Sequence, residues 1–530
     1  MSTYTDPEQI ATAYSTLQQT FKSGKTKSIA WRKWQLKQVW WMVADNEEAM
    51  VRVLHSDLNR HDFESYWLDV GGVKRDILDH IKHLETWTAD DIPDAGFLFG
   101  TLCGARIRKE PLGVILILGT WNAPFVVTFA PMVAAIAAGC AVLVKPSEIT
   151  MASQDLMAEI LPKYLDQEVI QIVTGGPKET GLILERRFDS IFYTGSSKIA
   201  KFVSAAAAKH LTPTVLELGG QAPCIVTGSA DIDSAAKRIM YSKFLNSGQI
   251  CLAANHVFVD PSVHDKFVER ATHWLGQFLK GDGKDQETRI VNERNYDRLV
   301  GLLNQSRGNI AYGGDKSRED RYIQPTLVTN VNMQDSLMSE EIFGPLLPIM
   351  KMDYHQACSL TSKGEHPLGL YIFSTSQAEI DEILSKTNSG GVTINDIMIH
   401  AGVPNTPFGG VGNSGTGAYH GRYGFDAFTH RRPVVCVPGW MDYLFGFRYP
   451  PYDKKHVSKI TINNPGFKRG EGMEDQVIGE GKTVRVVVRM GKWAMIAVGL
   501  ALVDARMGGR PRLLEVLMGW VDCLRSRLPM

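Results

Sequence analysis

The chain has 530 residues, of which 44% are hydrophobic and 22% are charged, and its formal net charge is zero. This length allows two or three domains with large cores, and the neutral balance gives no electrostatic footprint for a nucleic-acid partner. Seven scattered cysteines include no CxxC pair, which argues against a disulfide scaffold or a zinc site and indicates a reducing compartment.

The amino-terminal stretch, residues 1–10, is polar and lacks the basic-then-apolar layout of a secretory signal. We therefore expect a protein that is cytosolic or attached to a membrane from its cytosolic side. Apolar side chains recur at three-to-four spacing across residues 30–82, which predicts helices there.

Four short apolar runs then alternate with helical stretches. They are residues 113–119, 141–144, 169–173 and 190–193. Continuous apolar strands separated by helices are typical of a parallel sheet that is covered on both faces. The predicted fold class is therefore α/β, of the doubly wound type.

Polar residues follow three of these runs, at the sheet edge where doubly wound folds bind ligands. Residues 121–124 follow the first run, 145–148 the second and 194–197 the fourth. No GxGxxG fingerprint is present, so an ordinary Rossmann pyrophosphate loop is not expected. Gly195 and Ser196 open a predicted helix whose backbone N–H groups could meet a phosphate, although such residues often only cap a helix.

A carboxylate and a thiol lie 34 positions apart in the next part of the chain. Glu217 stands between two leucines, and an apolar setting of this kind keeps a carboxyl protonated longer, as suits a general base near neutrality. Cys251 follows a glycine-containing turn and would need backbone N–H groups or positive charge nearby to react as a thiolate. The structural alternatives are a salt-bridged core carboxylate and an ordinary buried cysteine.

The carboxyl-terminal tail carries a separate signal. Residues 493–503 form an uncharged run of 11, which is too short to span a bilayer, since spanning takes about 20 apolar residues. From residue 484 onward, eight basic residues face three acidic ones, and apolar residues after 512 share one helical face. This pattern favours peripheral membrane contact through residues 484–530, with packing on its own domain or across a dimer as the alternative.

Six stretches, taken together, identify a family. They read AKHLTP at 208–213, LELGG at 216–220, GQIC at 248–251, EEIFGP at 340–345, PFGGVG at 407–412 and GAYHG at 417–421. In this order they resemble the aldehyde dehydrogenase superfamily, and within it class 3, the fatty-aldehyde dehydrogenase branch. The resemblance covers roughly residues 20 to 450.

The resemblance implies the aldehyde dehydrogenase fold, with two doubly wound α/β domains, an arm that joins a homodimer, and a helical tail. The expected parts are a dinucleotide-binding domain (1–96 and 111–216), an oligomerisation arm (97–110 and 425–452), a catalytic domain (217–424) and a carboxyl-terminal extension (453–530).

It also implies the oxidation of an aldehyde to a carboxylic acid. Cys251 would attack the aldehyde as a thiolate, and Asn122 with the backbone N–H of Cys251 would stabilise the resulting oxyanion. Glu217 would deprotonate the water that hydrolyses the thioester. No metal is needed for this chemistry.

For the cofactor, the resemblance assigns Glu341 to the nicotinamide ribose, Phe343 to the nicotinamide ring, and Gly195 with Ser196 to the pyrophosphate. Lys145 would bind the adenine ribose. Because Glu148 would repel a 2′-phosphate, we expect NAD, with NADP as the alternative.

On the substrate side, Tyr419 and His420 match the class 3 pattern, with a structural role as the alternative. Ala123 stands where relatives often carry an aromatic residue, which predicts a wider tunnel. Ala200 replaces a glycine of many relatives and would tighten the cofactor pocket while favouring its helix. The expected substrate is a long-chain apolar aldehyde, followed by an apocarotenoid (polyene) aldehyde and then by an aromatic or short one.

Two other functions are compatible with part of this pattern. A thiol esterase could use Cys251 and Glu217 without any cofactor, but it has no need for Lys145, Gly195, Glu341 or Phe343. A non-catalytic scaffold of the same fold would be expected to lack the nucleophile or the base, and both are present.

Overall fold

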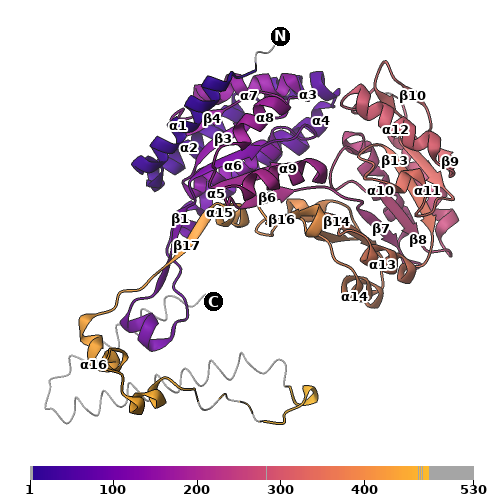
Figure 1. Ribbon diagram of the computed structural model, residues 1–530. Coiled ribbons are helices and arrows are strands. Elements are labelled where there is room, and N and C mark those ends of the chain that lie inside the picture. The colour runs from indigo at the N-terminus through magenta and orange to yellow at the C-terminus, as the bar shows by residue number, and fades with distance from the viewer. Residues whose placement is uncertain are drawn as a thin grey trace, which may run out of the picture. The chain divides into compact units, whose positions relative to one another are not determined.

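The computed structural model describes residues 4–281, 283, 285–462, 465, 467 and 469–476. The described residues up to Val437 form one compact unit (Figure 1), and the described residues from Pro438 onward belong to a second one. The predicted membrane element at 484–530 lies outside the described residues. Within them, no helix combines the length and the apolar character that crossing a membrane requires.

The first sheet has six strands in the order β16-β6-β5-β2-β3-β4, and all neighbours are parallel except β16 with β6. Its strands are β2 (Val114–Leu118), β3 (Ala141–Lys145), β4 (Ile170–Ile172), β5 (Ser190–Thr194), β6 (Thr214–Glu217) and β16 (Gly415–Thr416). Every residue of β2 and β3 is buried, as continuous apolar strands covered on both faces should be. The four strands predicted from apolar runs are confirmed.

Helices from three parts of the chain share one core with this sheet. They are α1 (Pro7–Ser23), α2 (Ile29–Ala44), α3 (Glu47–Leu58), α5 (Gly71–Thr88), α6 (Val126–Ala138), α7 (Met151–Tyr164), α8 (Pro177–Leu184), α9 (Ser197–Ala208) and α15 (Arg422–Ala427). The short α4 (Asp62–Ser65) lies between α3 and α5 in the chain and adds no side chain to this core. The helical pattern over 30–82 is thus realised as α2 to α5, with a short π-helical segment, η2 (Tyr66–Val70), before α5.

The second sheet has seven strands in the order β15-β14-β7-β8-β13-β12-β9, and only β9 runs antiparallel to its neighbour among the described strands. Its strands are β7 (Pro223–Val226), β8 (His256–Val259), β9 (Asn309–Tyr312), β12 (Thr326–Thr329), β13 (Leu346–Lys351), β14 (Gly369–Phe373) and β15 (Gly391–Ile394). A hairpin of β10 (Lys316–Ser317) and β11 (Tyr322–Ile323) stands apart from it.

Two cores cover the faces of the second sheet. Cys224 and Val226 of β7 belong to one core, and Ile225 between them belongs to the other, because successive side chains of a strand point to opposite faces. The helices are α10 (Ile232–Phe244) and α11 (His264–Phe278) on the first of these faces, and α12 (Glu293–Gln305), α13 (Tyr354–Lys363) and α14 (Gln377–Lys386) on the second.

An antiparallel ribbon projects from the first sheet. It consists of β1 (Arg106–Pro111) and β17 (Thr429–Val434), which run side by side in Figure 1. β1 follows the π-helical turn at Gly96–Leu102, and β17 follows α15. Among the described residues from Pro438 onward, α16 (Asp442–Phe445) is the α-helix.

The end of the expected catalytic domain differs from the sequence-based boundary. β16 pairs with β6 of the first sheet, and Phe425 and Phe428 are buried in the first core. Residues 415–428 therefore return to the first sheet, and the projecting ribbon starts at Thr429 instead of at residue 425. A sequence that alternates strands and helices throughout carries no sign of such a return.

Candidate active site

Two cavities meet at the edge of the first sheet. The larger has a volume of about 1050 Å³ and the smaller of about 650 Å³. Both are lined by the same six residues where they meet: Asn122, Val127, Thr194, Glu217, Leu218 and Cys251. The three side chains expected to perform catalysis thus lie together at the junction of the two cavities.

The topology explains this meeting. Asn122 follows β2, whereas Thr194 and Glu217 are the last residues of β5 and β6. These three strands are parallel neighbours, so their carboxyl ends lie at one edge, where ligands bind in doubly wound sheets. Cys251 arrives from the other domain, after α10.

The loop that carries Cys251 is tightly built. Asn246 and Ser247 both adopt left-handed backbone conformations, with φ of 52°. Gly248 follows with φ of 67°, and a Cβ there would lie 2.4 Å from the carbonyl oxygen of Gly344. The glycine before the nucleophile is therefore required by a close approach of two backbones.

The sulfur of Cys251 lies in a setting that favours the thiol. Burial raises its pKa to about 12, and the carboxyl groups of Glu341 and Glu217 add to the rise. The backbone N–H groups of Cys251 and Leu252 act in the opposite direction. Of the two settings that would favour a thiolate, backbone N–H groups are present, whereas the carboxyl groups of Glu341 and Glu217 favour the thiol. A nearby base must therefore take the thiol proton.

Glu217 is suited to that task. Its side chain is buried, neither carboxyl oxygen has a hydrogen-bond partner among the described residues, and burial raises its pKa well above 4.5. Its backbone is held firmly, since its carbonyl accepts a 3.0 Å hydrogen bond from Gly195 N and β6 is paired on both sides. A fixed carboxyl group with unused acceptors can receive a proton from the thiol or from a water molecule.

Asn122 is buried, and hydrogen bonds hold both its side chain and its backbone carbonyl in place. The side-chain Nδ2 donates a 3.1 Å hydrogen bond to the carbonyl oxygen of Gln249, two residues before Cys251. The backbone carbonyl of Asn122 accepts hydrogen bonds from Arg60 and from Asn246. Because an amide nitrogen carries two hydrogens, one remains for an oxyanion at the cavity junction.

The smaller cavity contains four of the six expected cofactor residues. Gly195 and Ser196 line it at the start of α9, where Ser196 caps the helix, and Glu341 and Phe343 line it as well. The pKa of Glu341 is raised to about 7, chiefly by burial. A Cβ at Gly219 would lie 2.3 Å from the Glu341 carboxyl, so this glycine is what admits the side chain.

These features fit a nicotinamide dinucleotide. The first N–H groups of α9 can meet the pyrophosphate, the Glu341 carboxyl can accept from ribose hydroxyls, and the ring of Phe343 is held edge-to-face against Trp121 at 5.3 Å. Lys145 and Glu148 form a 2.7 Å ion pair and line neither cavity. The reason is topological, because β3 lies one strand further out than β2.

All three expected substrate residues line the larger cavity. Ala123 borders it next to Asn122, and Tyr419 packs edge-to-face on Phe192 at 5.0 Å. Burial, Glu217 and Cys251 raise the pKa of the Tyr419 hydroxyl well above 10. His420 has φ of 91°, and its Nδ1 is buried without a hydrogen-bond partner in the part of the chain that the structure describes.

Comparisons with known proteins identify the family. The sequence profile of the "Aldehyde dehydrogenase family" matches residues 2–434. The chain belongs to the aldehyde dehydrogenase family. The expectation of an aldehyde-oxidising oxidoreductase that uses a nicotinamide dinucleotide is confirmed by this membership.

The similar aldehyde dehydrogenases include class 3 enzymes, which confirms the resemblance to that class. "Aldehyde dehydrogenase, dimeric NADP-preferring" of Rattus norvegicus is 42% identical over 82% of this chain and 96% of its own length. "Aldehyde dehydrogenase family 3 member A2" of the same species is 40% identical over 83% and 91%. "Beta-apo-4'-carotenal oxygenase" of Neurospora crassa is 38% identical over 87% and 88%.

A solved aldehyde dehydrogenase structure has the same fold. The substrate-bound state of Staphylococcus aureus AldH is 34% identical, with a TM-score of 0.78, and the match covers 83% of this chain and 99% of that one.

Within the described residues, no group of three or more His, Cys, Asp or Glu side chains could hold a metal ion.

Sequence reasoning missed several buried polar residues of this aldehyde dehydrogenase site. Arg60, Glu64 and Asp69 surround the loops of Asn122 and Cys251, and they belong to no recognisable motif. Lys243, at the end of α10, is also buried; burial lowers its pKa to about 7, and its Nζ donates to the carbonyl oxygen of Gly344 at 3.1 Å.

Proposed function

We propose that this aldehyde dehydrogenase oxidises long-chain apolar aldehydes to carboxylic acids, with NAD as the preferred cofactor. The observation that carries the proposal is the pair of cavities that meet at Cys251. The larger one has room for a long chain, and the smaller one has the residue types that a dinucleotide requires.

The catalytic groups act in sequence. As the Cys251 sulfur attacks the aldehyde carbon, the Glu217 carboxylate takes up the thiol proton. The remaining Nδ2 hydrogen of Asn122 and the backbone N–H of Cys251 donate to the new oxyanion, and a donor of this kind lowers the barrier by about 3 to 4 kcal/mol.

When bound, a nicotinamide dinucleotide supplies the acceptor for the two electrons and the hydrogen that leave the aldehyde carbon. What remains on Cys251 is a thioester. Glu217, after returning its first proton to solvent, deprotonates the water that attacks this thioester, and the carboxylic acid leaves while the sulfur regains a proton.

The shape of the larger cavity supports a long substrate. Two small residues line it where larger ones would narrow it, Ala123 beside the catalytic amide and Gly72 on α5. A Cβ at Gly72 would already lie 3.1 Å from Val126. An apocarotenoid aldehyde is the second candidate, because a relative of 38% identity is named for the oxidation of a carotenal.

The choice between NAD and NADP rests on Lys145 and Glu148. Their ion pair sets a carboxylate beside the lysine that would bind the adenine ribose, and this negative charge disfavours a 2′-phosphate. The name of the rat relative states that it prefers NADP, so the opposite cofactor preference occurs among related enzymes. Comparison of kcat/KM for the two cofactors decides between them.

We further propose a homodimer, joined through the β1–β17 ribbon and the preceding turn. Exposed apolar side chains support the proposal: Phe97 and Phe99 in the turn, and Val437 just after β17. The word "dimeric" in the name of a relative supports it as well. Sedimentation of the full chain tests it.

The expected peripheral membrane contact through residues 484–530, on the cytoplasmic side, is a proposal from sequence alone. Flotation with liposomes, before and after deletion of these residues, tests it. Unchanged flotation would remove the claim.

The main test follows NADH absorbance with saturated, polyene and short aldehydes. Wild type should oxidise the long saturated aldehydes with the highest kcat/KM, and Cys251→Ser should be inactive. A wild type that hydrolyses esters but reduces no cofactor with any aldehyde would favour a thiol esterase.

A further inference from the structure

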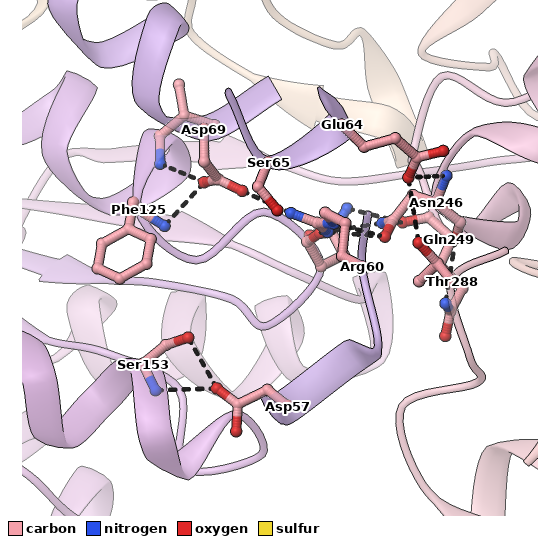
Figure 2. A network of polar contacts seen from close by, with 12 residues as sticks. Asp57, Arg60, Glu64, Ser65, Asp69, Phe125, Ser153, Asn246, Gln249 and Thr288 are labelled. Carbon is pink, nitrogen blue, oxygen red and sulfur yellow. Dashed lines mark hydrogen bonds and ion pairs between the residues drawn. The ribbon is translucent and has the colours of Figure 1, made fainter. Parts of the chain in front are cut away.

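Arg60 lies at the centre of a buried polar network beneath the active site (Figure 2). It follows α3 and the left-handed residue Asn59, and its side chain is fully buried. Its guanidinium forms a 2.6 Å ion pair with Asp69, which is equally buried. A buried charge pair of this kind is costly unless all its hydrogen-bonding groups are used, so its contacts are informative.

One side of the guanidinium holds the loop that carries the nucleophile. Nε and Nη2 both donate to the side-chain oxygen of Asn246, at 3.1 and 2.7 Å. The amide nitrogen of Asn246 in turn donates to the carbonyls of Asn122 and Gln249, each at 3.0 Å. The backbone N–H of Asn246 donates to Glu64 at 3.0 Å, which fixes the same loop from a third direction.

The other side holds the loop of the oxyanion donor. Nη2 donates directly to the carbonyl oxygen of Asn122. Through Asp69, the guanidinium also orders the next turn, because Oδ1 of Asp69 accepts from the backbone N–H groups of Phe125 and Val126, at 3.0 and 2.8 Å, where α6 begins. Figure 2 shows Asp69 between Arg60 and Phe125.

These contacts join three segments that are distant in sequence. Arg60 belongs to the amino-terminal helices, Asn122 to the end of β2, and Asn246 to the strained loop before Cys251. A backbone in left-handed conformations at two successive non-glycine residues persists only where its surroundings hold it in place. The network supplies these surroundings.

We propose that Arg60 is a positioning residue, which sets the distance and orientation between the Asn122 amide and the Cys251 sulfur by gripping the Asn122 carbonyl and Asn246 together. The proposal rests on the proposed function, since it needs an oxyanion at this junction. The Asn122 amide hydrogen that is not bound to Gln249 reaches the oxyanion only while the hydrogen bonds of Arg60 to the Asn122 carbonyl and to Asn246 are in place.

The planar guanidinium is what allows three acceptors to be held at once. A lysine in its place could keep the ion pair with Asp69, but its single ammonium cannot reach both faces of the network in fixed directions. Arg60→Lys therefore keeps the buried charge balanced and removes the positioning, which makes it the informative variant.

The experiment is a double-mutant cycle between Arg60→Lys and Asn122→Ala, in the full chain with NAD and a long-chain aldehyde. Arg60→Lys should lower kcat/KM for the aldehyde about tenfold, since a small misplacement of a catalytic group costs up to about 100-fold. The Kd for NAD should stay within twofold. In the Asn122→Ala background, Arg60→Lys should lower kcat/KM further by less than twofold, because the donor that Arg60 positions is absent.

Arg32→Lys is the matched control. Arg32 is another buried arginine, and it donates to the carbonyls of Thr26, Lys27 and Ala137, the last at the end of α6 away from the active site. It should change kcat/KM by less than twofold in both backgrounds, whatever its effect on thermal stability.

A second variant tests the proposal in case Arg60→Lys folds poorly. Asp69→Asn keeps an acceptor for the start of α6 and removes the charge that orients Arg60, so it should lower kcat/KM about threefold, again only when Asn122 is present. The proposal is overturned if the loss of kcat/KM caused by either variant is as large in the Asn122→Ala background as in wild type, because the variant then acts independently of the oxyanion donor. It is also overturned if both variants leave kcat/KM unchanged. An inactive wild type would instead contradict the proposed function.

Discussion

The backbone nitrogen of Gly195 donates a 3.0 Å hydrogen bond to the carbonyl oxygen of Glu217. This contact ties the residue that opens the cofactor-side helix α9 to the residue that carries the catalytic carboxyl. A Cβ at Gly195 would lie 2.3 Å from the hydroxyl of Tyr193, so a larger side chain would disturb both at once. The base and the cofactor cavity are thereby built on one rigid sheet edge.

Replacement of the base should separate the two halves of the reaction. In Glu217→Gln the thioester can form, at a reduced rate, but its hydrolysis loses the group that deprotonates water, so steady-state kcat should fall about 100-fold or more. Stopped-flow absorbance should then show one equivalent of NADH formed before turnover slows. A loss of kcat of less than threefold would show that another group serves as the base.

The pH dependence of wild type should follow the same carboxyl. Glu217 acts when ionised, and burial raises its pKa well above 4.5, so kcat should fall with decreasing pH already above the ordinary carboxyl range. The slope should approach tenfold per pH unit. A profile of kcat that stays flat down to pH 5 would contradict the assignment.

Stability should also depend on this group. Because the folded state binds the Glu217 proton more tightly than the unfolded state, wild type is stabilised below pH 4.5 and loses that contribution as pH rises toward the folded-state pKa, by about 1.4 kcal/mol per pH unit. Glu217→Gln has no carboxyl that titrates at this position, so its stability does not fall with rising pH for this reason. Its apparent Tm relative to wild type should therefore increase from pH 4.5 to pH 8, as measured by scanning calorimetry. A constant difference across this range would argue against a buried titrating carboxyl.

The width of the larger cavity should set chain-length preference. Ala123→Phe adds a ring beside Asn122, where the cavity meets the junction. We expect kcat/KM to fall about tenfold for a 16-carbon aldehyde and by less than threefold for a four-carbon one, since the longer chain needs the occupied volume. Equal losses for both lengths would mean that the ring disturbs the catalytic groups instead.

Cofactor preference should respond to Glu148. Glu148→Gln removes the negative charge beside Lys145 while leaving the lysine in place. The ratio of kcat/KM for NADP to that for NAD should rise about tenfold, chiefly through KM for NADP. Val127 lines both cavities and carries no charge, so a Val127→Ile control should leave this ratio unchanged.

Most of the residues that line the cavity junction could be singled out from the sequence, because they follow patterns. Asn122 follows the first predicted apolar run, and Glu217 stands between two leucines. In the structure Asn122 follows β2 and Glu217 ends β6, and the carboxyl ends of these parallel strands lie at one edge. Cys251 belongs to a family motif, whereas the raised pKa of its thiol depends on burial and on the carboxyls of Glu341 and Glu217, which are distant in the sequence. The surroundings of a reactive group are a tertiary property.

Other features left no signal in the sequence. Arg60, Asp69 and Asn246 are single polar residues in unremarkable segments, and their network arises only when three segments fold together. The return of residues 415–428 to the first sheet was missed for a similar reason, since β16 has two residues and pairs far away along the chain.

The most direct test of the central claim is the intact mass of Glu217→Gln after mixing with NAD and a 16-carbon aldehyde. We predict a mass increase of one acyl group, with peptide mapping to Cys251, and no such increase in Glu217→Gln/Cys251→Ser. An acyl group on another residue, or NADH formed with no acylated protein at any time, would contradict a thioester on Cys251.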